Sequence, residues 1–107
     1  MVRATVNGGP KAEVKTGESV ELNVEAEVPP NAGTIVSVEW DLDGWGSFPF
    51  RHDVDGSATS VNLSTTHSYD RPGTYFATAR VLSHREGKVD AEFRLIPNLA
   101  SVRIVVS

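Results

Sequence analysis

The stretch Val36-Ser37-Val38-Glu39-Trp40-Asp41-Leu42-Asp43-Gly44 decides how this chain folds. Apolar and polar residues alternate along it, which is the pattern of a half-buried β-strand. Such a strand points four apolar side chains to one face, those of Val36, Val38, Trp40 and Leu42. Burying one Trp side chain contributes on the order of 5 kcal/mol gross, comparable to the whole net stability of a small domain. We therefore expect a fold packed around a buried Trp40.

The composition restricts the fold and the partners. A chain of 107 residues fits one domain, which we place at residues 1–107, excised from a longer multidomain protein. The chain has no Cys, so its core holds together without disulfides or thiolate metal sites. A formal net charge of -4 argues against nucleic acid and anionic membranes as partners, and no apolar run is long enough for membrane insertion. We expect a monomer.

Alternation with period two continues through most of the chain, and no window shows a convincing helical period. The residues between 45 and 56 break the alternation. The predicted strands cover 2–6, 12–14, 19–28, 36–43, 59–65, 74–82, 89–95 and 100–106. Seven to nine short strands at this spacing predict an all-β fold, an antiparallel sandwich of two sheets.

The segment from Asp70 to Ala77 favours the immunoglobulin-like form of the sandwich. In that fold a Tyr near the start of strand F bonds back to the backbone upstream, and a Cys often follows two residues later. Here Ala77 takes that position, two residues after Tyr75. With Trp40 on the presumed strand C, the pattern is typical of an immunoglobulin-like sandwich without a disulfide.

Two motifs together resemble those of the polycystic kidney disease (PKD) domain. The first is Trp40-Asp41-Leu42-Asp43-Gly44, and the second is His67-Ser68-Tyr69-Asp70-Arg71-Pro72-Gly73-Thr74-Tyr75. The second motif is close to the family pattern H-x-Y-x-x-x-G-x-Y. The first departs from it, because Asp43 occupies the place of a glycine and Trp45 stands where a small acidic residue is often found. The alternating run at 89–95 makes the connection before the last strand longer than is usual in the family.

The resemblance implies an extracellular or cell-surface module without catalytic activity, often placed beside proteases or glycan hydrolases. Such modules act as spacers or protein-interaction domains, and their partners are the neighbouring domains, a polysaccharide or an extracellular protein. It also implies a structural core that contains Trp40, His67, Tyr69, Gly73 and Tyr75. In this pattern His67 precedes the tyrosine turn, where a ring nitrogen can hold the backbone.

Calcium is a candidate ligand because the chain holds two Asp-x-Asp-Gly tetrads. Asp41 and Asp43 belong to the first, and Asp53 and Asp55 to the second. Carboxylates at alternate positions of a tight turn suit Ca²⁺, yet neither loop follows the EF-hand pattern or ends in a bidentate Glu. The alternative is that these side chains bond the backbone of their own turns. We favour that alternative and expect no cofactor.

Trp45, Phe48 and Phe50 are the candidate binding residues, because they lie in the irregular segment after the Trp40 strand. As an exposed platform they would stack on a polysaccharide or a fibrous protein. The alternative is a small hydrophobic cluster packed beneath the loop.

Catalysis has little support in the sequence. His52, His67 and His84 are accompanied by Ser and Asp residues, but no nucleophile elbow or zinc-binding His pair is present. We therefore expect no enzyme, and we rank three hypotheses: a spacer or interaction module, a substrate-binding module, and a hydrolase in its own right.

Overall fold

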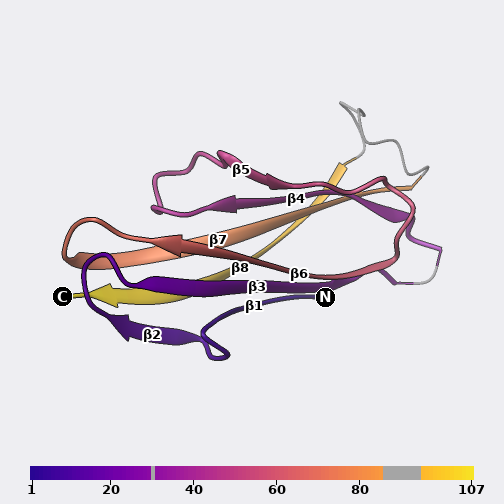
Figure 1. Cartoon of the computed structure of the whole chain (residues 1–107). Coiled ribbons are helices and arrows are strands. Elements are labelled where there is room, and N and C mark those ends of the chain that lie inside the picture. The colour runs from indigo at the N-terminus through magenta and orange to yellow at the C-terminus, as the bar shows by residue number, and fades with distance from the viewer. Residues whose placement is uncertain (30, 86–94) are drawn as a thin grey trace.

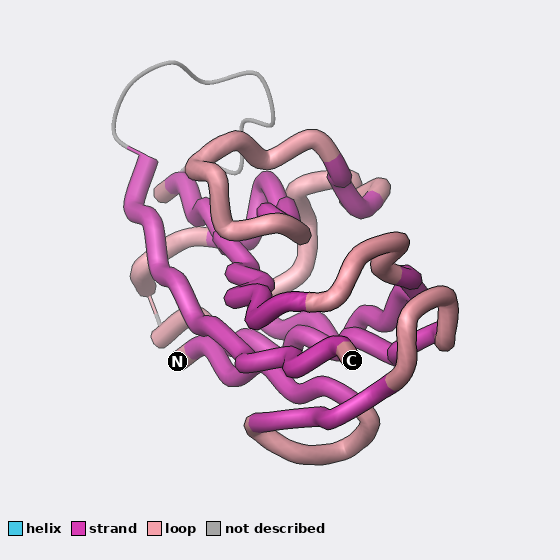
Figure 2. Tube along the Cα trace, turned by 90° about the vertical axis from the view of Figure 1, so that its left-hand side faces the viewer, coloured by secondary structure: helices cyan, strands magenta, loops and turns pink. Residues whose placement is uncertain are grey.

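The computed structural model describes residues 1–29, 31–85 and 95–107, and these form eight strands and no helix (Figures 1 and 2). The strands are β1 (Val2–Val6), β2 (Lys11–Val14), β3 (Ser19–Glu27), β4 (Thr34–Asp41), β5 (Phe50–His52), β6 (Ser60–Ser68), β7 (Gly73–His84) and β8 (Leu95–Val106). This confirms the all-β prediction.

The strands form two sheets. One has the order β1-β3-β6 and the other the order β2-β8-β7-β4-β5. All neighbours are antiparallel except β2, which runs parallel to the end of β8. The arrangement is consistent with the predicted immunoglobulin-like sandwich.

The core lies between the sheets and is built from alternating residues of the longer strands. In β3 the inward side chains are all buried, and they are Val20, Leu22, Val24 and Ala26. Trp40 on β4 is fully buried and lies opposite Ala79 of β7 in the register. The small Ala side chain leaves room for the neighbouring indole ring.

A β-bulge in β4 changes which residues face the core. The register with β7 skips Val36 between Ile35 and Ser37. Ile35 therefore belongs to the core cluster together with Val38 and Trp40, whereas Val36 is buried outside that cluster. The expected placement of Val36 on the Trp40 face is wrong, because one extra residue shifts the preceding part of a strand to the opposite face.

The boundaries of the last strand also differ from the prediction. The alternation predicts two separate strands, at 89–95 and 100–106, but β8 runs without interruption from Leu95 to Val106. Pro has no N–H to donate and is tolerated where a strand is locally an edge. β2 pairs only with residues from Arg103 onward, so at Pro97 β7 is the one described strand that pairs with β8. The rest of the predicted strand 89–95, residues 89–94, lies outside the described residues.

Gly33 marks a close approach between two segments. Its φ of +100° lies in the region that favours glycine. A Cβ added here would lie 2.2 Å from the carbonyl oxygen of His84 and 2.5 Å from the Cα of Arg85. The turn before β4 can therefore reach the end of β7 only without a side chain.

We predict that Gly33→Ala destabilises the domain far more than Gly17→Ala. Gly17 also has a positive φ, +83°, but nothing lies within 4 Å of an added Cβ. The left-handed conformation costs an Ala about 1 kcal/mol, and the clash at Gly33 adds roughly 2 kcal/mol more. Urea unfolding of both variants measures the difference. Equal losses of stability would show that the contact at Gly33 is not tight.

Candidate functional site

Trp40 carries one polar group into the core, and His52 satisfies it. The indole N–H donates to Nε2 of His52 at 3.2 Å. Nε2 accepts only when it carries no proton, so the contact fixes the neutral imidazole with its proton on Nδ1. Phe50 packs edge-on against the same ring, with centroids 5.0 Å apart. Burial lowers the pKa of His52 below its ordinary value, which also favours the neutral form.

We predict that the domain loses stability in mild acid through His52. Above about pH 6.5 the imidazole is neutral in both states, and its contribution to stability is complete. As the pH falls, the unfolded chain takes up the proton first because the folded pKa is lower, so the free energy of unfolding decreases. Thermal unfolding between about pH 7.5 and about pH 5 measures this loss.

The control is His52→Gln, whose side-chain oxygen can accept from Trp40 but does not titrate. Its melting temperature should vary less over the same pH range. A slope equal to that of the unmodified chain would contradict the assignment to His52.

Two tyrosines connect the segments that the sequence singled out. The Tyr69 hydroxyl donates to the carbonyl of Leu42 at 2.7 Å, and the Tyr75 hydroxyl donates to the carbonyl of Arg71 at 2.9 Å. The two rings stack with centroids 4.2 Å apart, and His67 packs edge-on against Tyr69 at 4.7 Å. Burial raises the pKa of Tyr69, and the nearby charge of Asp43 raises it further.

The residues of the predicted structural core occupy different depths. Trp40 and Tyr69 are buried, His67 and Tyr75 are half-buried, and Gly73 is exposed. Gly73 has a φ of +154° and lies against the Tyr75 ring, 3.7 Å from an added Cβ.

The two Asp tetrads make turns. The Asp41 carboxylate accepts the N–H groups of Gly44 and Gly46 at 3.0 and 2.8 Å. The Asp55 carboxylate accepts the N–H and hydroxyl of Ser57 at 2.9 and 2.6 Å, and these bonds lower the pKa of Asp55.

Asp43 and Asp53 are exposed. Within residues 1–29, 31–85 and 95–107, no group of three or more His, Asp or Glu side chains is placed to hold a metal ion. Calcium ligation by the two tetrads therefore stays a prediction.

The three candidate binding aromatics lie in three different environments. Trp45 is 86% exposed. Phe48 is half-buried, with its ring 3.9 Å from the guanidinium carbon of Arg80. Phe50 is on β5 and packs against the core. Of the three rings, that of Trp45 is thus the most exposed to solvent.

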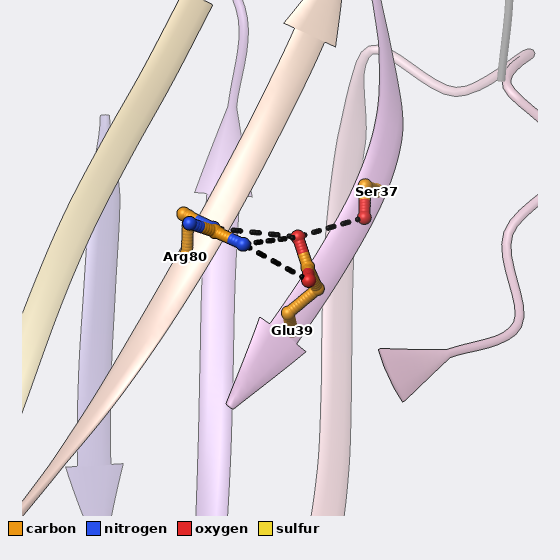
Figure 3. Close-up of polar contacts among 3 residues, drawn as sticks. All are labelled: Ser37, Glu39 and Arg80. Atoms are coloured by element: carbon orange, nitrogen blue, oxygen red, sulfur yellow. Dashed lines mark hydrogen bonds and ion pairs between the residues drawn. The ribbon is translucent and has the colours of Figure 1, made fainter. Parts of the chain in front are cut away.

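A polar network beneath Phe48 lies on the outer face of the larger sheet. Figure 3 shows Arg80 of β7 reaching toward Glu39 of the neighbouring β4. The guanidinium donates to both Glu39 oxygens at 3.1 to 3.4 Å, and the Ser37 hydroxyl donates to the same carboxylate at 3.2 Å. The Glu39 side chain is only 15% exposed. Arg80 thus contacts Glu39 and Phe48 together, which links the loop after β4 to the sheet.

Sequence reasoning missed Phe76 and Leu99 as surface residues. Phe76 is 53% exposed and Leu99 is 57% exposed, and their strands pair along the same sheet. The loop that carries Trp45 passes Phe76, because a Cβ on Gly44 would lie 3.2 Å from the Phe76 carbonyl oxygen. The alternation could have predicted the exposure of Phe76. It places the neighbours Tyr75 and Ala77 inward, so Phe76 between them points outward.

Comparison with known proteins identifies the family. The model of the PKD domain matches residues 3–95 of the 107. No curated protein matches the chain. Among the described residues there is no helix of the length and hydropathy needed to cross a membrane.

Proposed function

Because the chain belongs to the PKD domain family, we propose that it is a non-catalytic, load-bearing spacer between neighbouring domains of a larger secreted or cell-surface protein. PKD domains occur in extracellular or surface proteins and are generally non-catalytic modules. The spacer role is supported by the way the two terminal strands are fastened.

The ends of the domain lie toward opposite ends of its long axis, which measures 44 Å (Figure 1). Tension applied at Met1 and Ser107 therefore acts along β1 and β8 rather than across them. β1 holds to β3 through five residue pairs, and β8 holds to β7 through twelve. Hydrogen bonds loaded along a strand share the force, so they must break together.

The parallel pairing of β2 with β8 provides a second set of hydrogen bonds that resists extension. If β1 detaches, the pull passes to Lys11 and acts along β2 against β8. Ser107 strengthens this end of the chain: its N–H donates to the Val14 carbonyl at 3.0 Å, and its carbonyl accepts from the Thr16 N–H at 3.0 Å. The Thr16 hydroxyl donates to the same carbonyl at 3.0 Å.

We predict that the force needed to unfold the domain depends strongly on direction. The chain has no Cys, so engineered cysteines give unique attachment points. Pulling from residues 1 and 107 loads the terminal strands lengthwise. The second geometry pulls from Arg71→Cys and residue 107. These two points lie at the same end of the domain because Gly73 pairs with Val106. The force therefore separates β7 from β8 one residue pair at a time. Single-molecule pulling should give a several-fold lower force for the second geometry.

The control is the Arg71→Cys chain pulled from its two ends, which should unfold at the same force as the chain without that cysteine. Equal forces in the two directions would contradict a load-bearing spacer.

The exposure of Trp45 favours a second function, binding to a polysaccharide or fibrous protein. Its ring extends from a loop whose base is held by Asp41 and by the contact of Phe48 with Arg80. Phe76 adds a second exposed ring beside that loop. A fixed loop presents an aromatic ring with little loss of conformational entropy on binding.

We predict that Trp45→Ala abolishes retention of the domain on its polymer. Removing a central Trp from an interface costs about 2 kcal/mol or more. The measurement is co-sedimentation with a panel of insoluble polysaccharides and fibrous collagen, with calcium and then with chelator. The matched control is Ile96→Ala, which removes an exposed apolar side chain from a position paired with the buried Ser83.

Loss of binding in chelator would add calcium ligation by Asp41, Asp43, Asp53 and Asp55 to this proposal. Equal retention of the Trp45→Ala and Ile96→Ala variants would remove the loop as a binding site and leave the spacer role untouched.

A further inference from the structure

β6 is an edge strand that lacks the protection found on the other three edges. It pairs with β3 on one side, and no described strand pairs with its other side. It is nine residues long, whereas the other edge strands β1, β2 and β5 have five, four and three. Its register with β3 is continuous over all nine residues, without a bulge. A long, regular free edge is a template for pairing with another strand.

Charge distinguishes β6 from the other edges. β1 carries Arg3, β2 carries Lys11 and Glu13, and β5 carries Arg51. The sequence of β6 is SVNLSTTHS, which has no Asp, Glu, Lys or Arg. Charged side chains on an edge strand discourage pairing between molecules, so β6 lacks the feature that protects the other three.

The burial pattern shows that the edge is uncovered. The inward side chains of β3, next to β6, are buried. The inward side chains of β6 are only half-buried, and they are Val61, Leu63, Thr65 and His67. A strand added at this edge would bury these side chains further.

The outer face of β6 is also suited to pairing. Its outward side chains are small and uncharged, and they are Ser60, Asn62, Ser64, Thr66 and Ser68. Asn23 on β3 donates to Asn62 and Ser64 at 2.7 and 2.9 Å, which holds these two side chains flat against their own sheet. Among these outward side chains of β6, no bulky group obstructs an incoming strand.

We propose that β6 pairs antiparallel with β6 of a second copy of this chain, joining two three-stranded sheets into one sheet of six. The proposal goes beyond the spacer role and departs from the monomer expected from the sequence. Antiparallel pairing of a strand with itself produces a closed two-fold dimer. It places uncharged side chains opposite uncharged side chains, so the contact is self-complementary.

The acidic residues of β3 do not oppose this pairing. Glu21, Glu25 and Glu27 lie on β3, one strand away from the edge. In the dimer the two β3 strands are three strand spacings apart, about 14 Å. Physiological salt screens exposed charges beyond about 8 Å, so the repulsion between the two β3 strands is weak.

The test is sedimentation equilibrium of the whole chain from micromolar to millimolar concentration, with the variant Thr66→Lys. Thr66 is exposed and pairs with Glu21, so a Lys here gains a favourable neighbour within its own sheet and the fold is kept. In the dimer it adds a positive charge to each edge. We expect the unmodified chain to dimerise and the variant to dimerise roughly tenfold more weakly.

The matched control is Thr5→Lys, which makes the same change on β1 at the opposite edge of the same sheet. It should dimerise like the unmodified chain. Hydrogen exchange at high and low concentration supplies a second readout, in which β6 amides gain protection and β1 amides do not. The proposal is overturned if the unmodified chain stays monomeric, or if the two Lys variants affect dimerisation equally.

Discussion

The hydrogen bond from the Trp40 indole to His52 is the contact on which the rest of the structure depends. A fully buried Trp supplies the largest side chain of the core, but it also carries an N–H that costs stability unless it meets an acceptor. His52 supplies that acceptor from β5, a strand of three residues at the sheet edge. The short strand therefore completes the polar part of the core, and β4 holds the indole between the sheets.

The two tyrosines likewise combine a packed aromatic ring with a hydrogen-bonded polar group. Tyr69 and Tyr75 place their rings together and use their hydroxyls to hold the backbone at Leu42 and Arg71. The bond from Tyr69 to Leu42 joins the two motifs by which the family is recognised, although they are separated in sequence by more than twenty residues. The motifs thus describe one structural unit, in which aromatic rings pack and their polar ends fix the turns.

Alternation predicted most strands because each sheet has one face on the core and one in solvent. Alternation failed where the structure of a strand depends on a neighbouring strand. The bulge at Val36 arises from the register with β7. Pro97 is tolerated within β8 because β2 does not extend to it. In the candidate site, composition could not separate exposed Trp45 from Phe50, which packs on the core, since both lie in the irregular segment.

The loop after β4 is held in place by contacts that do not involve the Trp45 side chain at its tip. Asp41 caps its backbone, Tyr69 holds Leu42, and Arg80 holds Phe48, while Trp45 contributes to none of these contacts. The conformation of the loop therefore does not depend on the side chain at position 45. A substitution at the tip therefore changes the exposed surface of the loop without altering the sandwich that carries it.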